Sequence, residues 1–123
     1  MKKELNSTLS FIGLFILIFA VIITSGLLII KAQIQNELTD YLNNHFLDEL
    51  DYYEDLTDGI RTGSLTASDI DKIMLYDEIY LWEQSVQEKI DLANKYSWLL
   101  NDKLVYYYNH LYSLDYEWLI NGL

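Results

Sequence analysis

The sequence predicts an all-α protein in which a single N-terminal transmembrane helix continues into a small antiparallel helical hairpin or three-helix bundle. The chain has no proline and five glycines, so little in it interrupts helices. Apolar residues recur at steps of three and four along most of its length, which is the spacing of one helical face. A long uncharged segment near the start supplies the transmembrane helix.

This segment, residues 9–30, contains no charged side chain. As a helix it extends over about 33 Å, which is enough to cross a hydrocarbon core about 30 Å thick. A cleaved signal peptide has a shorter apolar core followed by small residues at a cleavage site. Here Thr24, Ser25 and Gly26 are followed by four more apolar residues, so we expect a retained membrane anchor.

The charges on either side of the segment indicate its orientation. Lys2 and Lys3 lie in the N-terminal residues 1–8, whereas Lys31 alone follows the segment before a long acidic stretch. Positive charge stays on the cytoplasmic side of a membrane. We therefore expect a single-pass protein of the cell membrane, with a short cytoplasmic N-terminus and with residues 31–123 on the extracytoplasmic side.

Three small residues of the apolar segment, Gly13, Ala20 and Thr24, fall on one helical face. Small residues let two helices approach closely in lipid. This transmembrane contact face is a candidate site for association with another subunit. The alternative is chance, because small residues are common in membrane spans.

The region after the anchor is strongly acidic. Residues 31–123 contain 6 lysines and arginines against 18 aspartates and glutamates, a net charge of −12. Nucleic-acid binding needs a basic surface, so the charge excludes this class of function. The acids are densest in a run that we call the acidic patch: Asp48, Glu49, Asp51, Glu54, Asp55 and Asp58. The patch is interpreted either as a solvated helix surface or as a surface that attracts a basic ligand.

The first helix is expected to continue beyond the membrane. Residues 31–56 have apolar side chains on one face, and no breaker separates them from the anchor, so we expect one helix from about Leu5 to Leu56. Residues 57–68 hold two glycines and a cluster of hydroxyl residues. They predict a loop, with Thr66 or Ser68 capping the next helix.

Two further helices are expected at 69–95 and 98–120. They could also be continuous, because neither glycine nor proline lies between them. One apolar series runs through both at steps of three and four, the signature of helices packed side by side. It predicts the buried face: Leu75, Ile79, Trp82, Val86, Ile90, Ala93, Ser97, Leu100, Leu104, Tyr107, Leu111, Leu114 and Trp118.

The helix at 98–120 is rich in tyrosine and tryptophan and carries a second apolar series beside the first. A helix buried on one side needs one such series, so the second favours contact with a partner. The predicted partner interface consists of Val105, Tyr108, Tyr112, Tyr116 and Leu119. Two alternatives stay open: a core that uses tyrosine for bulk, and a helix that lies in the membrane interface and contacts lipid.

Catalytic motifs are missing from the sequence, which has no cysteine, glycine-rich phosphate loop, zinc-ligand spacing or nucleophile motif. We therefore expect a non-enzyme without cofactor or metal. The favoured hypothesis is an accessory or assembly subunit of a membrane protein complex. It would contact other subunits, in a hetero-complex or homo-oligomer, through its transmembrane and C-terminal helices. The alternatives are a pilin-like structural subunit of a surface filament and a membrane-anchored module that captures a basic external ligand.

Overall fold

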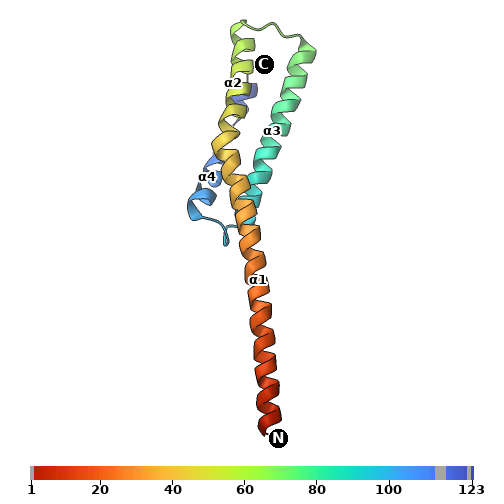
Figure 1. Cartoon of the computed structure of the whole chain (residues 1–123). Helices are drawn as coiled ribbons and strands as arrows, with labels where there is room; N and C mark the ends of the chain where they lie inside the picture. The colour runs from red at the N-terminus through yellow and green to blue at the C-terminus, as the bar shows by residue number, and fades with distance from the viewer. Residues whose placement is uncertain (1, 113–115, 122) are drawn as a thin grey trace. The chain divides into compact units, whose positions relative to one another are not determined.

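The computed structural model describes residues 2–112, 116–121 and 123, and within them it contains helices and no strand. This confirms the predicted all-α class. The chain consists of two structural units, residues 1–34 and residues 35–123. The helices, labelled in Figure 1, are α1 (Lys2–Asn44), α2 (Phe46–Thr62), α3 (Asp69–Lys95), α4 (Asp102–Tyr112) and α5 (Glu117–Ile120).

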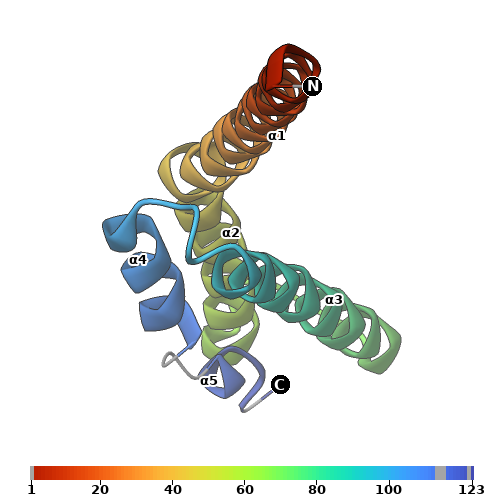
Figure 2. The ribbon, with the colours of Figure 1, turned by 90° about the horizontal axis from the view of Figure 1, so that it is seen from below.

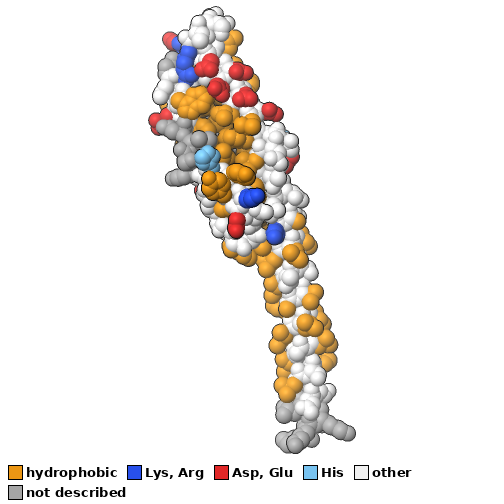
Figure 3. All heavy atoms as spheres, turned by 90° about the vertical axis from the view of Figure 1, so that its left-hand side faces the viewer, with side chains coloured by type: hydrophobic (Ala, Val, Ile, Leu, Met, Phe, Trp, Pro, Cys, Tyr) orange, Lys and Arg blue, Asp and Glu red, His pale blue; other side chains and the backbone are white. Residues whose placement is uncertain are grey.

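The N-terminal unit is the first part of α1, and this helix is long and apolar enough to cross a membrane. From Leu9 to Ile30 almost all large apolar side chains are exposed, from 40% for Ile30 to 71% for Phe11. Figure 3 shows hydrophobic side chains covering the helix toward the N-terminus. Such a surface is unfavourable in water and suits the hydrocarbon core of a bilayer.

α1 and α2 form one long bent helix, with the bend at His45. Main-chain hydrogen bonds continue through the bend. The N–H of His45 donates to the carbonyl of Tyr41 at 3.0 Å, and the carbonyl of His45 accepts from the N–H of Glu49 at 2.9 Å. The helix predicted from about Leu5 to Leu56 is therefore present, with a bend, and it continues to Thr62.

The loop predicted at 57–68 begins later, because α2 includes Thr57 and Thr62. The hydroxyl groups of these threonines donate to carbonyls of the preceding turn, at 3.1 and 2.8 Å, so both residues are accommodated inside the helix. α2 ends at Thr62 and is followed by Gly63, whose φ of +80° suits glycine and strains other residues. The prediction of a loop was wrong for residues 57–62.

α3 begins at Asp69, and Ser68, one of the two predicted capping residues, caps it. The N–H of Asp71 donates to Oγ of Ser68 at 3.2 Å, and the N–H of Ser68 donates to Oδ2 of Asp71 at 3.0 Å. This reciprocal capping box satisfies main-chain donors at the helix start. Hydrogen bonding to Ser68, first to its main chain and then to its side chain, lowers the pKa of Asp71.

The region after α3 is divided by a turn, so α3 and the following helix are separate. The turn covers residues 96–101, and α4 starts at Asp102 rather than at residue 98. The side chain of Asn101 accepts a hydrogen bond from the N–H of Lys103 at 2.9 Å, which caps the start of α4. The single helix predicted at 98–120 is therefore wrong. α4 ends at Tyr112, and the described chain resumes before α5.

The core of the second unit is formed by the last turns of α1 together with α2, α3, α4 and α5. The inner face of α3 is buried as predicted, from Leu75 to Ala93. Three predicted members of the buried series are exposed instead, namely Ser97, Tyr107 and Trp118. The turn at 96–101 interrupts the regular helical spacing of the apolar series. Tyr108 therefore takes the core position that was predicted for Tyr107. Leu114 lies outside the described residues.

α5 lies beside α2, as Figures 1 and 2 show. α5 packs against both α2 and α3. The guanidinium of Arg61 on α2 donates to the carbonyls of Trp118, Leu119 and Asn121, at 2.8 Å for Asn121 and 2.7 Å for Leu119. A cation suits this position, because the carbonyls at a helix C-terminus carry partial negative charge. Arg61 thus fastens the C-terminal segment to α2.

Candidate ligand-binding groove

An open cavity of about 700 Å³ lies between α2 and α3, and we call it the α2–α3 groove. Its lining combines carboxylates with aromatic and aliphatic side chains: Asp48, Glu49, Tyr52 and Tyr53 from α2, and Glu78, Leu81 and Trp82 from α3. These residues are far apart in the sequence and are brought together because the two helices flank the same aromatic cluster.

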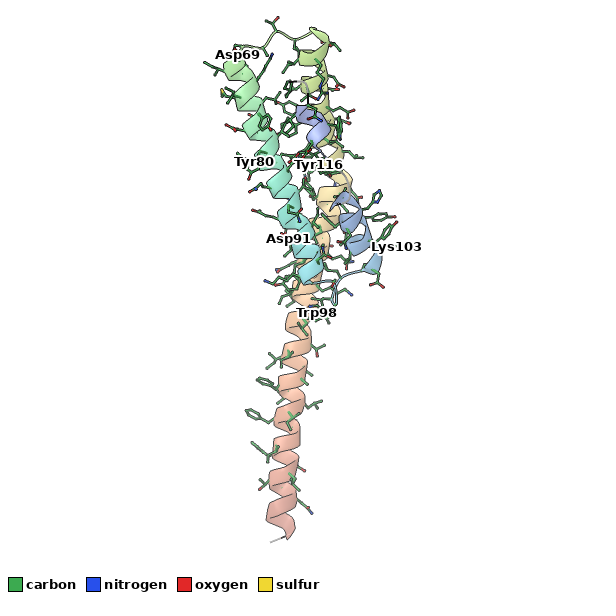
Figure 4. All side chains as sticks on the ribbon, turned by 180° about the vertical axis from the view of Figure 1, so that it is seen from behind. Asp69, Tyr80, Asp91, Trp98, Lys103 and Tyr116 are labelled. Atoms are coloured by element: carbon green, nitrogen blue, oxygen red, sulfur yellow. The ribbon has the colours of Figure 1, made fainter. Side chains whose placement is uncertain are left out.

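Trp82 forms the base of the groove and is 6% exposed. Its ring centroid lies 6.1 Å from that of Phe46, 5.4 Å from that of Tyr53 and 5.1 Å from that of Tyr116. In Figure 4 Tyr116 is seen between α2 and α3. Aromatic pairs at these separations stabilise one another beyond the area that they bury. The cluster therefore gives the groove a firm apolar base.

Glu49 is held in place at the edge of this base. Its Oε2 accepts a hydrogen bond from Nε1 of Trp82 at 2.9 Å and another from the hydroxyl of Tyr41 at 2.8 Å. Burial, and next the hydrogen bond and charge of Glu49, raise the pKa of Tyr41. The ammonium of Lys89 lies 4.3 Å from the ring centroid of Tyr41. The carboxylate of Glu49 is thus positioned before any ligand arrives.

The groove is negatively charged. Asp48 on α2 and Glu78 on α3 are exposed, Glu49 on α2 is half-buried, and the described lining contains no lysine or arginine. Burial, followed by the charge of Glu78, raises the pKa of Tyr53. Tyr52 is 57% exposed. Carboxylates beside exposed aromatic rings are suited to binding cations, because the ring faces also attract positive charge.

The predicted acidic patch is divided by the structure. Asp48 and Glu49 line the groove, whereas Asp51, Glu54, Asp55 and Asp58 do not. Asp58 pairs instead with the Arg61 guanidinium at 3.0 Å.

Sequence reasoning missed Glu78, the third carboxylate of the groove. It lies on α3, outside the acidic run, and the signal that could have found it is its place one helical turn before Trp82. That spacing puts Glu78 and Trp82 on the same side of α3.

The predicted partner interface is corrected for two of its residues. Tyr108 and Leu119 are fully buried, and the hydroxyl of Tyr108 donates to the carbonyl of Leu38 at 2.6 Å. They belong to the core of this chain and offer no surface to a partner. Val105 and Tyr116 are half-buried, and the side chain of Tyr112 lies outside the described residues.

The aromatic side chains that are exposed near and on α4 are different ones. Trp98 and Tyr106 are each 67% exposed, and Tyr107 is 54% exposed. Figure 4 shows where Trp98 lies in the turn before α4. The sequence series placed Tyr107 on the buried side, and it left Trp98 and Tyr106 outside the partner interface.

The residues of the predicted transmembrane contact face lie on α1. Gly13, Ala20 and Thr24 are all exposed on α1. The Thr24 hydroxyl donates to the carbonyl of Ala20 at 2.7 Å, so this polar group is satisfied within the helix. Packing of another helix on this face stays a prediction.

Tyr116 leads to a prediction about alkaline stability. Its hydroxyl is buried without a hydrogen-bond partner among the described residues. Burial, and next the charge of Glu83, raise the pKa of Tyr116 to about 12. An unfolded tyrosine ionises near pH 10. Between these two values the unfolded state loses the proton first, so we expect the free energy of unfolding to fall as pH rises through that interval.

The Tyr116→Phe variant tests this explanation. It keeps the ring against Trp82 and removes a buried hydroxyl that has no partner, so we expect stability at pH 7 to be unchanged or slightly higher. Urea unfolding of the full chain in detergent, repeated from pH 7 to beyond pH 10, measures both effects. The variant should lose less stability than the parent at high pH. A clear loss at pH 7 would contradict the assignment.

Comparison with models of known protein families found no matching family for this chain, and comparison with curated proteins and with solved structures also gave no match.

Proposed function

We propose that the protein is a non-catalytic, single-pass membrane protein that acts as an accessory subunit by binding a basic segment of a partner protein in the α2–α3 groove. The observation that carries this proposal is the groove itself, in which three carboxylates lie beside the exposed Tyr52, the half-buried Tyr53 and the buried Trp82. The partner would be another protein of the same membrane, on the extracytoplasmic side. This combines two of the functions expected from the sequence, the accessory subunit and the capture of a basic ligand.

The chemistry of the groove favours lysine and arginine side chains. Their long aliphatic stems pack on apolar surface while the charged ends reach polar groups. In the groove, Leu81 and the ring of Tyr52 offer the apolar surface, and Asp48 and Glu78 offer the carboxylates. A cation over an aromatic ring contributes about 0.5–1 kcal/mol at exposed sites. Several such contacts are needed for useful affinity, so a segment with more than one basic residue fits best.

The charge of the whole region supports the same partner. A net charge of −12 over residues 31–123 attracts cationic partners from a distance and accelerates their association. An anchor in α1 would hold the groove close to other membrane proteins, which raises its effective concentration relative to a free domain.

The experiment compares two double variants that remove the same charge from different places. Asp48→Asn with Glu78→Gln neutralises the groove, and Asp51→Asn with Glu54→Gln neutralises two acids of α2 that do not line it. The full chain is placed in nanodiscs of zwitterionic lipid. Binding of a fluorescent peptide of lysine and glycine residues is then measured by anisotropy.

We expect the groove variant to weaken peptide binding about tenfold, which corresponds to about 1.4 kcal/mol. The matched variant should change the affinity by less than about twofold, because its charges are screened by water and salt. Equal losses in the two variants would mean that general acidity attracts the peptide. The groove would then have no special role, and the proposal would be abandoned.

A second candidate function is an accessory role through the exposed aromatic side chains near α4. Trp98, Tyr106 and Tyr107 favour it, because tryptophan and tyrosine are enriched at protein interfaces. The rings of Tyr106 and Tyr107 pack edge to face with centroids 5.9 Å apart. Native mass spectrometry after mild detergent extraction distinguishes the candidates. Loss of a co-purifying subunit in Tyr106→Ser with Tyr107→Ser, but not in the groove variant, would favour this surface.

A further inference from the structure

We infer that the partner segment is a basic amphipathic helix, and that its apolar face docks on the outer side of α3. This inference rests on the proposed function, because the basic side chains of the same helix would occupy the α2–α3 groove. It adds the secondary structure of the partner segment and a second contact surface that extends beyond the groove.

The first half of α3 is apolar on two opposite sides. The inner side is buried and includes Leu75, Ile79 and Trp82. At about 3.6 residues per turn, a second set of large side chains falls on the opposite side of the helix. We call this set the outer stripe: Ile70 (69% exposed), Ile73 (62%), Met74 (61%), Tyr80 (56%) and Leu81 (65%).

The outer stripe is confined to the first half of α3, and the same side of the second half is polar. Beyond Leu81 the same side of the helix carries polar and charged residues, all of them exposed: Gln84, Glu88, Asp91 and Lys95. That is the ordinary pattern for a helix with one buried face. Asp69, Tyr80 and Asp91 are labelled in Figure 4 and mark where the two halves lie. The apolar residues therefore belong to a defined part of the surface.

The size of the outer stripe fits a short helix. Residues 70–81 of α3 extend over about 18 Å at 1.5 Å per residue. Its five side chains are each 56–69% exposed, so they form an apolar patch on one side of the helix rather than a single scattered residue. A partner helix of about three turns could cover it with side chains at steps of three and four.

The charge around the outer stripe indicates which kind of partner could bind there. Residues 69–83 contain five acids and one lysine. Asp77 lies within the outer stripe and Glu78 beside it, and both are exposed. A second copy of this chain would bring the same acids against them, and an anionic lipid surface would also be repelled. A helix whose apolar face is bordered by lysine or arginine could pack its apolar side chains on the stripe and pair its basic side chains with these acids.

The outer stripe is continuous with the groove. Leu81 belongs to both, and Glu78 lies on the groove side of the stripe. A helix lying along α3 would therefore direct the basic residues on one of its sides toward Glu78 and Asp48. This continuity is the reason to assign one occupant to the two surfaces.

Two synthetic peptides test the inference. Both have the same leucine and lysine content, but one has leucine at helical spacing and the other has a shuffled order without an apolar face. Each is titrated against the full chain in nanodiscs of zwitterionic lipid, and binding to empty nanodiscs is subtracted. The outer-stripe variant is Ile73→Gln with Met74→Gln. Leu47→Gln is the control, since Leu47 is 61% exposed on α2 and does not line the groove.

We expect the amphipathic peptide to bind about tenfold more tightly than the shuffled one. The outer-stripe variant should abolish this difference, and Leu47→Gln should preserve it. Asp48→Asn with Glu78→Gln should weaken both peptides. If that groove variant weakens both while the outer-stripe variant changes nothing, the inference fails and the proposed function stands.

If the groove variant leaves the affinities of both peptides unchanged, the proposed function fails, and the inference that rests on it fails too. Sedimentation of the full chain alone tests whether a second copy of the chain binds the outer stripe instead. A dimer that dissociates in Ile73→Gln with Met74→Gln would identify a second copy on the outer stripe and overturn the inference.

Discussion

Replacement of Tyr108 by alanine is expected to destabilise the protein by about 3–5 kcal/mol, the usual cost of removing a buried aromatic ring. Tyr108 is fully buried and belongs to the core between α4 and the last turns of α1. Its hydroxyl also donates to the carbonyl of Leu38 at 2.6 Å. Alanine would leave a cavity and would remove this link between helices far apart in the sequence. Urea unfolding of the full chain in detergent, followed by near-ultraviolet circular dichroism, measures the loss.

Three matched variants separate the contributions. Tyr108→Phe keeps the ring and loses the hydroxyl, and it should cost about 1 kcal/mol, the net contribution of one hydrogen bond. Leu104→Ala removes a neighbouring core side chain that is 8% exposed and should cost about 2–5 kcal/mol. Tyr106→Ala, at a residue that is 67% exposed, should change stability by about 0.5 kcal/mol or less. If Tyr108→Ala behaved like Tyr106→Ala, Tyr108 would be a surface residue, as the sequence predicted.

The contrast between α3 and α4 shows how far the sequence could predict the core. On α3 the apolar steps of three and four are unambiguous, and the residues from Leu75 to Ala93 are buried as predicted. On α4, Tyr107 and Tyr108 are adjacent, and either one could continue the predicted buried series. The choice between Tyr107 and Tyr108 depends on where the preceding turn restarts the helix. That turn contains neither glycine nor proline, so its position could not be predicted.

The candidate site was partly predictable for a similar reason. Asp48 and Glu49 stand in a conspicuous acidic run, but the other half of the groove comes from α3. Finding Glu78 requires the pairing of two helices, which is a long-range property. The outer stripe was overlooked for a different reason. The buried series already accounted for α3 as a helix, so the second set of apolar steps, from Ile70 to Leu81, was not needed to explain it.

Replacement of Glu49 by alanine is the second large effect that we expect. Glu49 is the common acceptor for two donors on buried residues, the hydroxyl of Tyr41 and Nε1 of Trp82. These residues are 7% and 6% exposed, so both donors would lose their partner away from bulk water. A buried donor without a partner costs about 1–3 kcal/mol, so the two donors together give about 2–6 kcal/mol. The same unfolding measurement checks this value.

Glu49→Gln is the matched control, because its amide oxygen can still accept both hydrogen bonds. We expect it to cost about 1 kcal/mol, since hydrogen bonds to an uncharged acceptor are weaker. If both variants lost the same large amount, the negative charge of Glu49 would be the stabilising feature and its geometry would matter less. If neither lost stability, Tyr41 and Trp82 would have found other partners. With the expected result, Glu49 is fixed by the fold before binding, so a ligand gains its charge without the entropic cost of ordering it.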